Sequence, residues 1–164
     1  MYVPNYLNKN YSDVIEKKVG DYTNTQLNIQ ANKCSDFEIY YIGEGNKTLF
    51  KNFYITENND DTISIIAKTT NELINLFDNR TNGYSNSFKK HSEVQSVKGY
   101  KKMKCPKCAN ENFNISMFLE YQNEEILKEE DEGIYDYSNT FQWIKIYTKC
   151  CKCGKKLEIL NYED

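Results

Sequence analysis

Two pairs of cysteines, each with two residues between its members, could hold a metal ion. Cys105 and Cys108 form the first pair, and Cys150 and Cys153 form the second. This spacing lets one tight turn direct two sulfurs at a single ion, and four thiolates in a tetrahedron make the closed site that structural Zn²⁺ takes. The sequence therefore predicts one bound Zn²⁺ with these four residues as its ligands.

Two other kinds of cysteine chemistry compete with zinc binding. A disulfide framework needs an oxidising compartment, and the chain shows no apolar signal segment at its start. Thioredoxin-like redox chemistry needs a βαβ context, whereas the pattern after Cys108 is that of a strand. Cys151 lies only one residue from Cys153, which strains a metal-binding turn, so we expect Cys151 to be a spare thiol. Cys34 stands alone in the sequence, and we expect it to be buried.

The residues around the two pairs resemble the zinc-ribbon family over residues 104–164. Cys-Pro-Lys-Cys is followed by a strand pattern, and a second strand pattern ends in Cys-x-x-Cys-Gly-Lys. The whole chain is also similar to small bacterial proteins with a C-terminal ribbon. Members of the family usually have glycine after the first pair, where this chain has Ala109, and Asn110 is the residue that could take the left-handed backbone angle instead. The resemblance implies a structural metal and a small antiparallel sheet, but no substrate, because ribbons serve in many functions.

The first half of the chain combines strand and helix patterns. Short segments of alternating apolar and polar residues, separated by turn-forming residues, predict an antiparallel meander. These segments are 37–41, 49–55 and 63–65. Residues 12–19, which precede Gly20, predict a helix, and residues 69–80 predict another because Thr69 and Glu72 have capping-box spacing. A third, short helix is expected at 87–94.

The expected architecture is therefore α+β, with a small antiparallel sheet and one or two helices followed by a C-terminal antiparallel zinc ribbon. We expect two units, an α+β unit at residues 1–96 that ends in a polar linker and a zinc ribbon at residues 97–164. The ribbon strands are expected at 113–121, 141–147 and 155–160, with unbroken alternation in the first. Trp143 is expected to pack beside the zinc site or against the first unit.

The composition and charge say little about a substrate. The net charge of −3 gives no argument for general nucleic-acid binding. No apolar run approaches the ~18 residues of a membrane span, so we expect a cytoplasmic protein with no membrane partner. His91 is the sole histidine, and the chain has no glycine-rich phosphate loop and no serine-centred elbow, so we expect no enzymatic activity.

The residues between the long ribbon strands, 122–139, form an acidic insertion that predicts a binding function. A ribbon needs only a short turn there, and long loops in compact domains are usually functional or disordered. We expect the protein to bind another protein with a basic surface, as an immunity-type or regulatory inhibitor. The residues expected to contact the partner are Glu129, Glu130, Asp131, Glu132, Tyr135 and Tyr137. The plain alternative is that the insertion is a solvated loop.

Nucleic-acid binding is the second function that the sequence supports. Several lysines between residues 98 and 107 surround Tyr100 and Met103 and lead into the first cysteine pair. Basic residues with an aromatic side chain among them could contact a phosphate and a base. The structural alternative, a solvated linker, is the interpretation that we favour for this segment.

Overall fold

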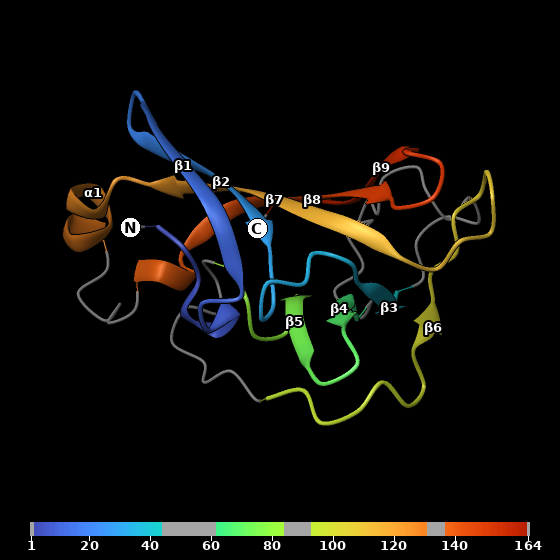
Figure 1. Cartoon of the computed structure of the whole chain (residues 1–164). Helices are drawn as coiled ribbons and strands as arrows, with labels where there is room; N and C mark the ends of the chain where they lie inside the picture. The colour runs from blue at the N-terminus through green and yellow to red at the C-terminus, as the bar shows by residue number, and fades with distance from the viewer. Residues whose placement is uncertain (1, 44–61, 84–92, 131–136, 164) are drawn as a thin grey trace.

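The chain forms two antiparallel sheets and little helix (Figure 1). The computed structural model describes residues 2–43, 62–83, 93–130 and 137–163. The five-stranded sheet has the order β1 (Tyr11–Val19), β2 (Tyr22–Ile29), β7 (Phe113–Gln122), β8 (Phe141–Cys150) and β9 (Lys156–Glu163). The four-stranded sheet has the order β5 (Leu73–Asp78), β4 (Ser64–Lys68), β3 (Glu38–Ile42) and β6 (Lys101–Lys102). The helical elements are η1 (Asn5–Leu7), α1 (Glu124–Glu130) and η3 (Tyr137–Asn139). The α+β prediction is therefore wrong, and the described chain is mostly β.

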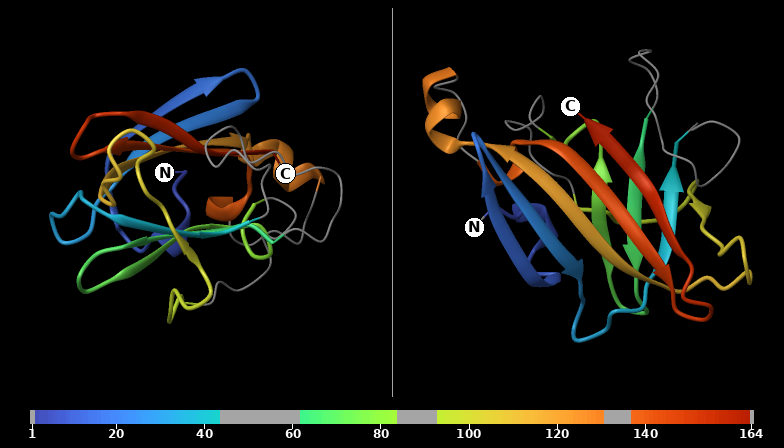
Figure 2. Two further views of the ribbon diagram at one scale, coloured as in Figure 1. Left: turned by 90° about the vertical axis from the view of Figure 1, so that its right-hand side faces the viewer. Right: turned by 90° about the horizontal axis from the view of Figure 1, so that it is seen from above.

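The two sheets lie one over the other and share one core (Figure 2). In β7 every second side chain is buried, from Phe113 to Tyr121, while the side chains between them face outward. This alternation is what a strand with one face on a core requires. The inward side chains of the five-stranded sheet meet those of the four-stranded sheet, among them Leu27, Ile115, Leu119, Ile39, Ile65 and Phe77.

Residues 12–19 form strand β1, where the sequence predicted a helix. A β-bulge between Ser12 and Ile15 places two residues of β1 opposite one residue of β2. The bulge puts Val14 against the core and leaves Ile15 outside, so the apolar residues lose the alternation that marks a strand. Gly20, the expected helix stop, has φ +61° and begins the two-residue turn between β1 and β2.

Residues 73–78 form strand β5, where the sequence predicted a second helix. A bulge next to Ile65 of β4 gives β5 one extra residue, so both Leu76 and Phe77 are buried. Two adjacent buried residues imitate the stripe of an amphipathic helix. Thr69 and Glu72 close the turn between β4 and β5, with the Thr69 amide donating to the Glu72 carbonyl at 2.9 Å.

Several other predictions of elements can be compared with the structure. The strands expected at 37–41, 63–65, 113–121, 141–147 and 155–160 correspond to β3, β4, β7, β8 and β9. The segment 49–55 and most of 87–94 lie outside the described residues. Strands from residues 1–96 and from 97–164 share both sheets, since β2 pairs with β7 and β3 pairs with β6. The division into two units stays a prediction about which parts fold by themselves.

The acidic insertion begins and ends in contact with the rest of the protein. Leu127 of α1 is fully buried, and the Asn123 amide donates to the carbonyl of Asp21 at 2.7 Å. At the other end of the insertion, the Tyr121 hydroxyl donates to the carbonyl of Ser138 at 2.9 Å. None of the described helices has the length and apolar character that crossing a membrane requires.

Candidate metal centre

Two turns of the same geometry carry the four predicted ligands. The first knuckle, residues 105–109, follows β6, and the second knuckle, residues 150–154, joins β8 to β9. The amides of Ala109 and Gly154 donate to the carbonyls of Cys105 and Cys150 at 2.8 and 2.9 Å. In each knuckle the amide of the first cysteine also donates to the carbonyl five residues later, at 2.8 and 2.9 Å. The knuckles are therefore structural repeats, and each directs two sulfurs to one side.

The four sulfurs lie close enough together to share one ion. The Sγ atoms of Cys105 and Cys153 are 3.6 Å apart, as are those of Cys108 and Cys150, and all four lie within 4.8 Å of one another. Four sulfurs ~2.3 Å from one Zn²⁺ would lie ~3.8 Å from one another. All six cysteines are free thiols, so no disulfide competes for these sulfurs. The cluster is compatible with a zinc site that has no open coordination position.

The thiol pKa values show why four sulfurs at this distance suit a cation. Burial raises the pKa of the Cys150 thiol, but hydrogen bonds from the backbone amides of Cys153 and Lys152 outweigh it, so the pKa lies at about 6. The backbone amide of Asn110 favours the Cys108 thiolate, but burial and the neighbouring sulfurs outweigh it and raise the pKa to about 12. Without a cation the cluster therefore cannot hold four thiolates at neutral pH. A bound divalent cation supplies the positive charge that would let all four ionise.

The cluster lies where the chain passes from one sheet to the other. The first knuckle leads from β6 of the four-stranded sheet to β7 of the five-stranded sheet, and the second knuckle ends β8. The Cys151 amide donates to the carbonyl of Asn112 at 3.0 Å and joins the second knuckle to the segment between the first knuckle and β7. Next to them, Phe37 and Phe113 exchange two backbone hydrogen bonds of 2.9 Å. An ion in the cluster would therefore tie the two sheets together.

Asn110 has a role beside the sulfurs that the sequence did not reveal. Its Nδ2 atom donates to the carbonyl of Asn112 at 2.7 Å and lies 3.5 Å from the Sγ atom of Cys150. A donor to a ligand sulfur orients the ligand and stabilises its thiolate. The expectation that Asn110 takes the left-handed backbone angle is wrong, because Ala109 has φ 58°. The knuckle hydrogen bonds place Ala109 where the second knuckle has Gly154, which has φ 70°.

The two cysteines outside the cluster are both exposed. The Sγ atom of Cys151 points to Asp36, 3.5 Å from its Oδ1 atom, and is not part of the cluster. Cys34 is exposed too, so the prediction of a buried thiol is wrong. Its Sγ atom lies 3.4 Å from the carbonyl of Asp36, in the tight turn that follows β2.

The lysine-rich segment before the first knuckle is engaged in structural contacts. Lys102 is ion-paired with Glu38 and Glu111, and the Nζ atom of Lys104 lies 3.2 Å from Glu111. The Tyr100 hydroxyl and the Ser64 hydroxyl are 3.0 Å apart. Met103, the other apolar residue of the segment, is buried in the core. Contacts within the protein therefore explain the positions of Tyr100, Met103, Lys102 and Lys104, and no bound ligand is needed to explain them.

The residues predicted to contact a partner fall partly within the described chain. Glu129 lies exposed in α1, and Glu130 is the last residue of that helix. Tyr137 begins η3, with the Nζ atom of Lys128 5.5 Å from its ring centroid. The other three predicted contact residues, together with His91, lie outside the described residues: Asp131, Glu132 and Tyr135. A role of the insertion in binding stays a prediction.

Trp143 is not near the metal cluster, so the predicted position beside the zinc site is wrong, and its contacts with Asn161, Lys145 and Phe118 are made within residues 97–164 and not with the first unit. It lies on the outer face of β8, at the end away from Cys150, and its Nε1 atom donates to Asn161 at 2.6 Å. The Nζ atom of Lys145 lies 4.1 Å from its ring centroid, and its ring meets that of Phe118 edge to face. The sole tryptophan therefore belongs to an aromatic and basic group on the outer face of the sheet.

Comparison with protein-family models, with curated protein sequences and with solved structures finds no match to this chain. The zinc-ribbon resemblance of residues 104–164 therefore rests on the cysteine spacing and on the clustering of the four sulfurs. The class that the fold and site define is a two-sheet antiparallel β protein with a cluster of four cysteines that could hold a metal ion.

Proposed function

We propose that this chain is a non-enzymatic binding protein, braced by one zinc ion, that recognises another protein. Zinc is the ion that four-thiolate tetrahedral sites commonly take, and such sites leave no position for a substrate. An ion that joins the two sheets would stabilise the fold, because the cysteines can form the site only after folding brings them together. The metal is thus assigned to the structure of the protein, and recognition to its surface.

The observation that carries the proposal is an apolar surface on the hairpin of β1 and β2. Ile15, Val19 and Tyr22 are 62%, 47% and 39% exposed, and all three lie on the outer face of the sheet. Val19 and Tyr22 are directly opposite each other in the strand register. The tip of this hairpin lies at the same end of the protein as α1 (Figure 1). Large apolar side chains gathered on a protruding element mark interaction surfaces.

Acidic residues border this hairpin surface and indicate the chemistry of the partner. Asp21 lies in the hairpin turn, and its carbonyl accepts the hydrogen bond from Asn123 that fixes the start of α1. Glu125 and Glu129 of α1 are exposed beside it. A partner that fits would have apolar residues at the centre of its surface and basic residues around them, and the charges would mainly accelerate association. An immunity-type or regulatory inhibitor that covers a basic enzyme surface is the specific form of this proposal.

Affinity purification with the tagged, zinc-loaded protein tests the hairpin surface. Replacing Ile15, Val19 and Tyr22 together by threonine keeps β-propensity and removes the apolar groups. We expect recovery of the partner to fall at least about tenfold, because each buried anchor of an interface contributes ~1 kcal/mol or more. Tyr147→Thr is the matched control, since Tyr147 lies on the same face at the other end of the sheet and is 37% exposed. Equal recovery by the triple variant and the control would refute the proposal.

Neutralising the acidic residues tests the predicted role of the insertion separately. The variant carries glutamine or asparagine in place of Glu129, Glu130, Asp131 and Glu132. At low salt we expect slower association with the purified partner, measured by surface plasmon resonance, and a smaller effect at high salt because ions screen the charges. An unchanged association rate at low salt would show that the insertion does not take part in recognition. It would not contradict the role proposed for the hairpin surface.

A further inference from the structure

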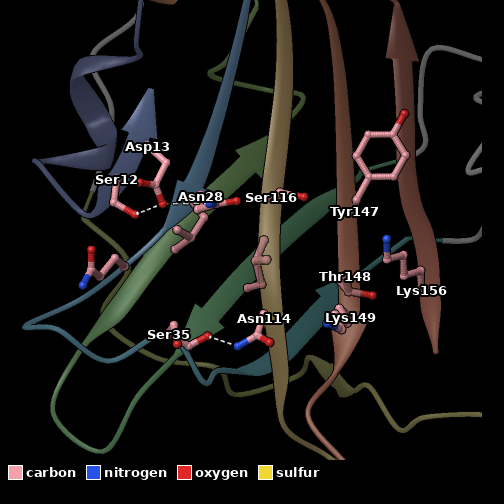
Figure 3. A pocket seen from close by; sticks show the side chains of 13 residues that line it. Ser12, Asp13, Asn28, Ser35, Asn114, Ser116, Tyr147, Thr148, Lys149 and Lys156 are labelled. Carbon is pink, nitrogen blue, oxygen red and sulfur yellow. Dashed lines mark hydrogen bonds between the residues drawn. The ribbon is translucent and has the colours of Figure 1, made fainter. Parts of the chain in front are cut away.

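A polar hollow of about 720 Å³ lies on the outer face of the five-stranded sheet, at the end next to the knuckles (Figure 3). The hollow lies where β2 ends and the chain that follows it turns away from β7. Residues of strands β1, β2, β7, β8 and β9 line it. Six side chains around it carry its chemistry: Asp13, Asn28, Asn114, Tyr147, Lys149 and Lys156. The hollow is far from the hairpin tip, and of the proposed protein-binding surface only Ile15, two residues from Asp13, comes near it.

Two lysines on one side of the hollow face each other, and neither is ion-paired with Glu158, the carboxylate opposite Tyr147 on the same face. Lys149 of β8 and Lys156 of β9 are directly opposite in the strand register. Like charges in that position disfavour strand pairing. Among the described residues, no carboxylate lies within ion-pair distance of either lysine. Lys152 and Lys155 of the adjoining turn are exposed as well, so this edge would be stabilised by a bound anion.

The opposite side of the hollow presents a fixed hydrogen-bond acceptor. Asp13 lies in the bulge of β1 with φ 52°, a left-handed conformation that only a few residue types adopt readily. The Ser12 hydroxyl and the Asn28 Nδ2 atom donate to its Oδ2 atom at 3.1 and 3.0 Å. Bulges often re-aim a side chain beside a functional site, and strained conformations cluster there. The hollow therefore has an oriented carboxylate on one side and two cations on the other.

An exposed aromatic ring, that of Tyr147, lies on the side of the two lysines, with the carboxylate of Glu158 beside its hydroxyl. Tyr147 is opposite Ser116 in the register, and Ser116 is opposite Asn28, so the three form one row across β8, β7 and β2. Lys149 and Asn114 form the next row towards the knuckles. Figure 3 shows these side chains along one face of the sheet, with the Tyr147 ring extending beyond the strand. A flat ligand on this ring would lie next to the two lysines, and the polar side chains of Ser116 and Asn28 would continue its row across the sheet.

We propose that the hollow binds a nucleotide of single-stranded nucleic acid. The base stacks on Tyr147, the flanking phosphates pair with Lys149 and Lys156, and Asp13, three strands away in β1, accepts a hydrogen bond from an amino group of a further base of the same strand. A base can reach such a ring only when it is unstacked and unpaired, so the site fits a single strand and not a duplex. A protein partner is a poorer fit, because most of the residues around the hollow carry amide, hydroxyl or charged groups, with Ile29 and Ile115 between them.

Four lysines at this end of the sheet, Lys149, Lys152, Lys155 and Lys156, outnumber the carboxylates of Asp13, Asp36 and Glu158 beside them, although the whole chain has a net charge of −3. The acidic residues of α1 follow the far end of β7, a strand of ten residues and therefore ~33 Å long. At physiological salt, charges are screened over ~8 Å, so the carboxylates of α1 do not act on the hollow. Lys145 lies one row farther from the knuckles on the same outer face, where a second phosphate could follow.

Fluorescence anisotropy with labelled oligonucleotides and the zinc-loaded full chain tests the proposal. Probes of ~12 nucleotides match the length that single-strand sites cover. We expect saturable binding of single-stranded DNA or RNA, at least about tenfold weaker binding of the duplex, and a log–log salt slope of about −1.4 for two neutralised phosphates. No saturable binding at low salt, equal binding of the duplex, or equal competition by a mononucleotide would each overturn the proposal.

Charge-reversed variants locate the phosphate contacts. Replacing Lys149 and Lys156 together by glutamate should lower the affinity at least about tenfold and bring the salt slope close to zero. Replacing Lys17 and Lys18 of the distant hairpin by glutamate changes the net charge equally and should leave the affinity within about twofold of that of the original chain. Equal losses in the two variants would indicate attraction by overall charge alone and would contradict the assigned site.

Substitutions of Tyr147 test the stacking contact. Tyr147→Ala should weaken binding about tenfold, the effect of removing one ring from a base-stacking site, whereas Tyr147→Phe should keep the affinity. Thermal unfolding of each variant shows whether the fold is retained, and both substitutions are at a partly exposed outer position. If the folded Tyr147→Ala variant binds as tightly as the original chain, the base does not stack there and the proposal fails.

Discussion

The residues that follow the two cysteine pairs allow a paired test of the metal-binding turns. Ala109 and Gly154 occupy equivalent places and both have positive φ, yet only the second is glycine. Ala109→Gly should stabilise the zinc-loaded protein, and Gly154→Ala should destabilise it. The left-handed conformation costs a residue with a Cβ atom ~1–2 kcal/mol, while the greater backbone entropy of glycine in the unfolded chain costs ~0.4–1 kcal/mol.

The expected net change is therefore about 1 kcal/mol in each direction. A Cβ atom at Gly154 would meet no other atom within 4 Å, so its cost comes from the backbone conformation and not from a clash. In a chain of this length, 1 kcal/mol shifts the unfolding temperature by ~2–4 °C. The double variant Ala109→Gly with Gly154→Ala should unfold close to the temperature of the original chain, because the turns would exchange their strain.

Calorimetry at a fixed free zinc concentration measures these shifts. Gly20→Ala is the control, since Gly20 also has positive φ and open space around it but lies in the β1–β2 turn. It should lower the unfolding temperature by a similar amount and leave the zinc affinity unchanged, whereas Gly154→Ala should lower both. A neutral or destabilising Ala109→Gly, in a protein that still binds zinc, would refute the assignment of strain to Ala109.

Two further predictions concern thiols and pH. In zinc-loaded protein, iodoacetamide should modify the two exposed thiols, Cys34 and Cys151, and should modify the other four only after a chelator has removed the metal. Mass spectrometry counts the modified thiols. Rapid modification of more than two thiols in the zinc-loaded protein would contradict the site. Cys151 should react slowly, because partial burial and a nearby carboxylate raise its pKa to about 11. Lys102 donates to Glu38 and Glu111 and holds both pKa values below their ordinary value of 4.5, so its contribution to stability is present at neutral pH and is lost as the pH falls below about 4.5. Lys102→Met should therefore destabilise the protein more at pH ~7 than at pH ~3 in urea unfolding, and an equal effect at both would exclude this linkage.

The metal cluster was predictable from the sequence because its geometry is local. Each cysteine pair forms its own turn, and the side chains of residues 113–121 alternate without a break between core and surface, so spacing and alternation predicted both the clustering of the four sulfurs and the strand. The contact between Asn110 and the Cys150 sulfur was not predicted, because it joins two segments 40 residues apart in the sequence. No local pattern marks a side chain that supports a ligand from another turn.

The failures of prediction have a common physical cause in the β-bulges. In β1 and in β5 one extra residue shifts the side chains that follow it to the other face. The result is adjacent apolar residues, such as Leu76 and Phe77, which a helix would also place on one face. The hollow beside Tyr147 was likewise hidden, because it exists only after β2 pairs with β7.

The pairing of β2 with β7 has a consequence for the order in which the chain can fold. Residues 22 and 122 are partners in this ladder, one hundred positions apart along the chain. During synthesis the N-terminal hairpin leaves the ribosome long before its neighbour exists, and closing so long a loop is slow. Until then β2 presents an unpaired edge that other chains can join. The second cysteine pair is synthesised later still, so the metal can join the two sheets only at the last stage of assembly.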